Sequence, residues 1–95
     1  MQIPIAELQR IIERLFQHLE DYGIDSVEIP VDYYWNIPND QIYKPYQDPS
    51  KIDMGQLSDD WSELQKIIHL DREPVGYDFV LLASIIRAIG EHSIA

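Results

Sequence analysis

The spacing of the apolar residues changes along this chain, and each change predicts a different kind of local structure. Over residues 5–22 the apolar side chains recur at steps of three and four, which places them on one face of an α-helix. Over residues 27–35 they alternate with other residues, as in a strand with one buried side. Nearly every residue from 79 to 89 is apolar again. Helices and strands must therefore share one small fold.

Three helices are predicted, over about residues 4–22, 58–70 and 75–89. In the first helix, Pro4 suits the first turn and Gly23 suits the left-handed position just beyond the end.

Capping residues also mark the other two helices. Ser58 is predicted to cap the second helix, followed by Asp59 and Asp60 where the helix dipole favours acids. Gly90 is the predicted end of the third helix. Because the third helix is apolar on nearly every side, we expect it to be the central element of the core.

Two strands, over about residues 26–35 and 51–55, are predicted to form a small antiparallel element. Pro30 has no N–H to donate, which makes the first strand an edge strand or one broken by a bulge. The alternation turns Tyr33 and Trp35 toward the core and Tyr34 outward. The predicted class is α+β, in a single compact domain over residues 1–95.

The charge balance disfavours one large class of partner, the nucleic acids. Seventeen Asp and Glu oppose seven Lys and Arg, giving a formal net charge of −10. A nucleic-acid partner is not expected, because such binding depends on basic clusters that neutralise phosphates.

No apolar run reaches the length of a membrane span and the start lacks the pattern of a signal peptide, so a cytoplasmic protein without a membrane partner is expected.

Signals for catalysis or cofactor binding are weak. The chain has no cysteine, which excludes disulfides and thiolate chemistry. Its three histidines have no metal-binding spacing, and its four glycines are scattered singly, unlike a phosphate loop. We therefore expect no enzyme activity, no cofactor and no metal site.

Aromatic residues gather in the acidic middle of the chain, which indicates either a protein interface or rings that cover an edge of a small core. An exposed tyrosine among acids combines an apolar ring with a polar tip, as interface residues often do. The expected function is that of an acidic protein-binding module for a basic protein partner. Its predicted interface residues are Tyr34, Asp32, Glu28, Tyr43 and Tyr46.

Two alternatives stay open. One is a small enzyme or ligand-binding domain that uses Asp32, Asp59, Asp60 and Arg87. The other is self-association through the apolar third helix, so the sequence does not decide between a monomer and a homodimer.

Several motifs together resemble those of a family of small acidic bacterial proteins of unknown function. They are Asp32-Tyr33-Tyr34-Trp35, Gly55-Gln56-Leu57-Ser58-Asp59-Asp60-Trp61 and Arg87-Ala88-Ile89-Gly90. The resemblance covers about residues 25–90 and implies a bacterial cytosolic origin, with no activity or cofactor attached.

Overall fold

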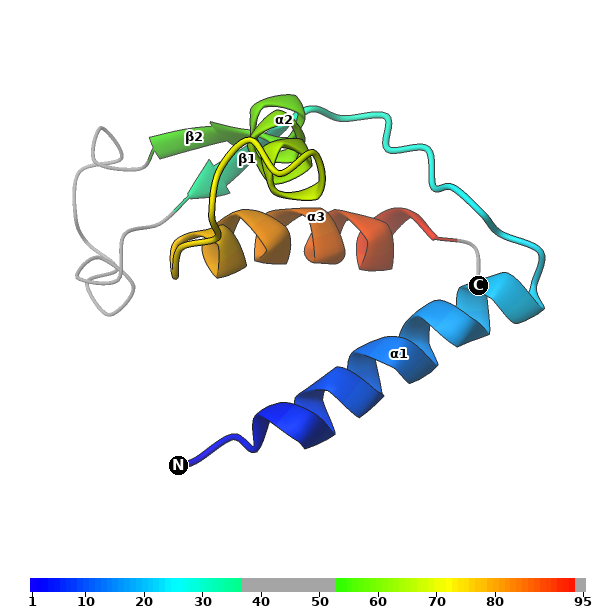
Figure 1. Cartoon of the computed structure of the whole chain (residues 1–95). Coiled ribbons are helices and arrows are strands. Elements are labelled where there is room, and N and C mark those ends of the chain that lie inside the picture. The colour runs from blue at the N-terminus through cyan, green and yellow to red at the C-terminus, as the bar shows by residue number, and fades with distance from the viewer. Residues whose placement is uncertain (37–52, 94–95) are drawn as a thin grey trace. The chain divides into compact units, whose positions relative to one another are not determined.

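The computed structural model of this chain describes residues 1–36 and 53–93. The elements follow in the order α1 (Ile5–Asp21), β1 (Tyr33–Asn36), β2 (Asp53–Gln56), α2 (Leu57–Ile68) and α3 (Asp78–His92), shown in Figure 1. The predicted α+β class, with three helices and a two-stranded antiparallel sheet, is confirmed.

The chain divides into two compact units, which we describe separately. The first contains Met1–Glu28 and the residues from His92 onward, and the second contains Ile29–Glu91. The single compact domain expected over residues 1–95 stays a prediction. In the parts that the structure describes, no helix is both long and apolar enough to cross a membrane.

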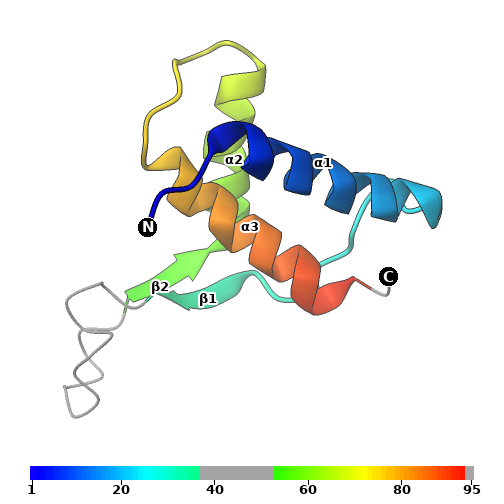
Figure 2. The ribbon, with the colours of Figure 1, turned by 90° about the horizontal axis from the view of Figure 1, so that it is seen from below.

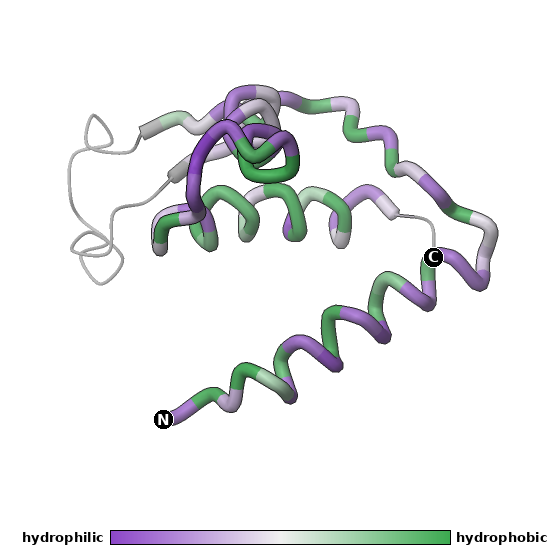
Figure 3. Tube along the Cα trace, viewed as in Figure 1, coloured by the Kyte–Doolittle hydropathy of each residue, from purple (hydrophilic) through white to green (hydrophobic). Residues whose placement is uncertain are grey.

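Helix α1 makes up most of the first unit. Its apolar and polar residues alternate along the helix in Figure 3, and none of its residues is buried. At its end Gly23 has a φ of 73°. The Gly23 and Ile24 amides donate to the carbonyls of Glu20 and Leu19, both at 2.9 Å. This is the paired hydrogen-bond pattern of a Schellman ending, which confirms the role predicted for Gly23.

The second unit contains a short antiparallel hairpin (Figure 2). Tyr33 pairs with Gln56, Tyr34 with Gly55, and Trp35 with Met54. The predicted strand over 26–35 was too long, because β1 begins only at Tyr33. The second strand, predicted over 51–55, ends at Gln56, one residue later than expected.

The core of the second unit lies where α2 and α3 meet the hairpin. Its buried apolar residues are Leu57, Ile85 and Ala88, and the partly buried Ile29, Tyr34, Leu64 and Ile89 pack against them.

Helix α3 buries one face, although its sequence is apolar almost all round. Leu82 and Ile86 remain 36% and 38% exposed. The expectation that this helix is the central element of the core stays a prediction, because α1 belongs to the other unit. The helix also begins at Asp78, later than predicted, and passes through Gly90 to His92.

Candidate functional site

The two sides of β1 are the reverse of what the alternation predicted. Tyr34 packs against the core, whereas Tyr33 and Trp35 are 60% and 66% exposed. The Tyr34 ring lies over Gly55, its partner in the register, where any Cβ would overlap the ring. The prediction of an outward Tyr34 was wrong, because alternation groups side chains by face without saying which face is buried.

Tyr34, Asp60 and Ser84 form a set of hydrogen bonds that we call the hydroxyl cluster. The Tyr34 hydroxyl donates to Oδ2 of Asp60 at 2.5 Å, and Ser84 Oγ lies 2.6 Å from the same oxygen. Ser84 Oγ is also 2.7 Å from the Leu81 carbonyl. A hydroxyl has one proton to donate, and an ionised carboxylate is the stronger acceptor.

The hydroxyl cluster joins β1, α2 and α3 around a carboxylate that is only 8% exposed. Burial, followed by the bond to Asp60, raises the pKa of Tyr34 above its ordinary value. Tyr34 therefore stays protonated near neutral pH and can act as the donor that a buried carboxylate needs.

Asp32 caps α2 from outside the helix. Its carboxylate accepts from the Ser58 amide at 2.7 Å and from the Ser58 hydroxyl at 2.8 Å. It also accepts from Gln56 Nε2 at 2.8 Å. These bonds, that of Gln56 foremost, lower the pKa of Asp32.

The cap predicted from Ser58 was therefore wrong. Ser58 supplies donors, and the acceptor comes from a residue 26 positions earlier. The helix itself begins at Leu57, and Gln56 at its N-cap makes no side-chain capping bond.

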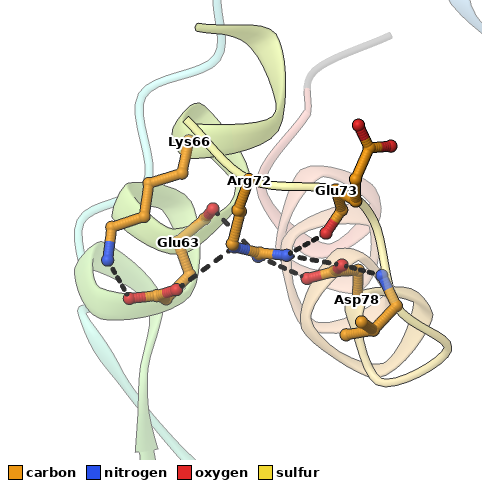
Figure 4. Close-up of polar contacts among 6 residues, drawn as sticks. Glu63, Lys66, Arg72, Glu73 and Asp78 are labelled. Atoms are coloured by element: carbon orange, nitrogen blue, oxygen red, sulfur yellow. Dashed lines mark hydrogen bonds and ion pairs between the residues drawn. The ribbon is translucent and has the colours of Figure 1, made fainter. Parts of the chain in front are cut away.

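A second set of polar contacts, which we call the turn cluster, holds the connection between α2 and α3 (Figure 4). The Arg72 guanidinium meets the Asp78 carboxylate in two bonds, of 2.6 and 2.9 Å. It also donates to the Glu63 carbonyl at 3.1 Å, while the Val75 amide donates to Asp78 at 2.7 Å. The Arg72 hydrogen bond, then that from Val75, lowers the pKa of Asp78 from 3.8 to about 2.

The turn cluster was not predicted from the sequence. Arg72 and Asp78 are six positions apart and belong to no periodic pattern. The available signal was an arginine in a loop followed by an acid in the first turn of a helix, where the dipole favours it.

The predicted interface also included Glu28, Tyr43 and Tyr46. Glu28 is exposed and belongs to the first unit. Tyr43 and Tyr46 lie outside the described residues.

The four residues of the predicted enzyme or ligand site are engaged separately. Asp32 caps α2, Asp60 accepts from the two hydroxyls, and Asp59 is exposed. The Arg87 side chain is 83% exposed and pairs with Glu91 at 3.0 Å. Residues 1–36 and 53–93 contain no group of three His, Cys, Asp or Glu that could hold a metal ion.

The outer side of the hairpin carries three large exposed side chains, Tyr33, Trp35 and Met54, which we call the hairpin face. Their exposed fractions are 60%, 66% and 56%. Trp35 is directly opposite Met54 in the register, and Tyr33 is two residues before Trp35, so all three share one side of the sheet. The sequence correctly predicted that Tyr33 and Trp35 share one side of the strand, but it placed that side in the core, whereas it is exposed.

Comparison with models of protein families, with curated proteins and with solved structures finds no match to this chain. The resemblance to small bacterial proteins therefore stays a prediction.

Proposed function

We propose that this protein is an acidic protein-binding module that receives a basic partner protein on the hairpin face. The observation that carries the proposal is the grouping of Tyr33, Trp35 and Met54, each more than half exposed, on one side of a two-stranded sheet. Trp and Tyr are enriched among the residues that dominate binding energy at protein interfaces. Met adapts its shape to different partners.

The charge of the chain supports a basic partner. The net charge is −10, and eleven carboxylates but only two lysines lie between Glu20 and Glu63. Asp32 directly precedes Tyr33, and its lowered pKa keeps it ionised beside the hairpin face. A negative field of this kind accelerates association with a cationic surface.

This proposal changes the role of two predicted interface residues. Tyr34 is not part of the proposed interface, because its ring packs on the core and its hydroxyl donates to Asp60. Tyr33 and Trp35 take its place. Asp32 remains as a source of negative charge, although its carboxylate oxygens also cap α2.

The test is affinity capture with the wild-type chain and two variants, followed by titration of the captured protein. Tyr33→Ala with Trp35→Ala removes the aromatic part of the hairpin face. Trp61→Ala is the matched control, because Trp61 is a 51% exposed tryptophan on α2 rather than on the strands. A basic protein should bind the wild type and the control but not the double variant, and binding should weaken with salt.

In the titration, Trp35→Ala alone should cost about 2 kcal/mol or more, about thirtyfold in Kd. The folded fraction of each variant is measured by circular dichroism. Equal binding by the double variant and the wild type, with both folded, would show that the hairpin face is not the interface.

A further inference from the structure

In the described residues, one edge of β1 pairs with no other strand, and a single backbone contact shows which of its hydrogen-bonding groups point to that edge. The Leu57 amide donates to the Asp32 carbonyl at 2.7 Å, and the register places these two residues opposite each other. In an antiparallel ladder, hydrogen-bonded pairs alternate with non-hydrogen-bonded pairs. Tyr34 and Gly55 therefore form a bonded pair, and the pairs of Tyr33 and Trp35 are non-bonded.

It follows that the amides and carbonyls of Tyr33 and Trp35 point away from β2, toward the outside of the sheet. In the part of the chain that the structure describes, the sheet has only these two strands. Figure 2 shows no helix or strand of the second unit along the outer side of β1. β1 is short, but it contains neither the proline nor the lysine with which proteins often block an edge.

The edge of β2 is less open. Figure 2 shows α2 leaving the end of β2 on the side away from β1. Because α2 begins at Leu57, directly after the last residue of β2, the helix limits the length of chain that can pair there.

We propose that the partner binds the outer edge of β1 as a third, extended strand containing arginine or lysine. This inference rests on the proposed function and specifies how the hairpin face is used. The partner's amides and carbonyls pair with those of Tyr33 and Trp35. Every second side chain of the partner strand then lies on the same side of the sheet as the hairpin face, next to its rings. Strand addition of this kind takes affinity from the main chain and specificity from alternate side chains.

The occupant is another protein rather than a second copy of this chain. Each copy carries a net charge of −10, so two copies repel, whereas a basic strand is attracted. Arginine also suits the exposed rings of Tyr33 and Trp35, because a guanidinium stacks on aromatic faces.

The probes for the test are two synthetic ten-residue peptides of alternating arginine and valine. One is unmodified, and the other is N-methylated at every backbone amide, so that neither of its edges can donate to β1. The two peptides have the same charge and side chains, but the methylated one lacks the donors for strand pairing. Binding is followed in the Trp61→Phe variant, in which Trp35 is the one remaining tryptophan of the chain.

We expect the unmodified peptide to bind at least about tenfold more tightly than the methylated one, a difference of about 1.4 kcal/mol. Hydrogen exchange by NMR gives an independent readout. The amides of Tyr33 and Trp35 should exchange more slowly when the unmodified peptide is bound, and that of Tyr34, already paired with Gly55, should change little.

Two outcomes overturn the inference, and they differ in what they mean for the proposed function. If both peptides bind equally, strand addition is wrong. The hairpin face is then still the cation-binding site if Trp35→Ala, titrated by calorimetry, weakens the binding of both peptides, and it is not the site if Trp35→Ala changes neither. If neither peptide binds at low salt, strand addition and the preference for a basic partner are both wrong.

Discussion

The hydroxyl cluster and the turn cluster each bury one carboxylate, and they satisfy it in different ways. Asp60 and Asp78 are equally buried, both 8% exposed. Asp60 accepts from the neutral hydroxyls of Tyr34 and Ser84, which lie 26 and 24 positions away. Asp78 accepts from a guanidinium only six positions away and from a backbone amide three positions away.

The difference shows that the two clusters stabilise different parts of the fold. The hydroxyl cluster forms only when β1, α2 and α3 have assembled, so its energy belongs to the tertiary structure. The turn cluster fixes one connection, because its contacts all lie within the segment from Glu63 to Asp78. In either cluster, a buried carboxylate that lost its hydrogen-bond donors would lower the stability of the fold.

The largest expected effect is that of Tyr34→Ala. The change removes a ring from the core and a donor from Asp60, and we expect a loss of about 3–5 kcal/mol in the free energy of unfolding. Tyr33→Ala is the matched control, expected within about 0.5 kcal/mol because that ring is exposed. Urea denaturation measures both. An equal loss from Tyr33→Ala would reverse the assignment of the two sides of β1.

Tyr34→Phe isolates the hydroxyl and should cost about 1.5–3 kcal/mol, as for a hydrogen bond to a charged group. Ser84→Ala should lower the free energy of unfolding by less, because Tyr34 still donates a hydrogen bond to Asp60. Since both hydroxyls reach the same oxygen, the double variant should deviate from additivity by about 0.5–3 kcal/mol. Strict additivity would mean that the two bonds act independently.

Leu70→Gly, at the end of α2, should stabilise the protein by up to about 1 kcal/mol, whereas the substitutions above destabilise it. Leu70 has a φ of 59° and is 88% exposed, so glycine relieves strain without removing a buried side chain. The position matches that of Gly23, because Leu70 and Asp71 donate to the carbonyls of Ile67 and Lys66. A thermal melt measures the change, and a lower melting temperature would contradict the prediction.

The pH dependence of stability tests the charge of the turn cluster. The pKa of Asp78 falls from 3.8 to about 2 on folding, chiefly because of Arg72. A depressed pKa gives stability that is complete above the unfolded value and is lost as the pH falls through the folded value. The stability difference between the wild type and Arg72→Met should therefore narrow as the pH falls from 3.8 toward about 2.

Lys66→Met is the control for this experiment. It removes a cation from an exposed pair with Glu63, whose side chains are 49% and 46% exposed. Its effect on stability should be smaller at every pH, because exposed ion pairs contribute little. A constant difference for Arg72→Met across the acid range would show that the guanidinium acts through packing rather than charge.

Local patterns predicted the helices well, because capping and periodicity act over a few residues. The end of α1 at Gly23 is decided by a left-handed position that glycine occupies without steric cost. The cap of α2 could not be predicted in this way, because its acceptor, Asp32, lies 26 residues earlier in the chain. Ser58 was a plausible local cap, but a distant carboxylate took that role.

The sequence by itself determined the class of the fold, the approximate helices and the grouping of Tyr33 with Trp35, since each follows from spacing along the chain. Only the tertiary structure decided which side of β1 is buried. Reversing the sheet keeps the same alternation, and the choice depends on Gly55 making room for the Tyr34 ring and on Asp60 accepting its hydroxyl. These contacts join residues more than 20 positions apart, and no local pattern records them.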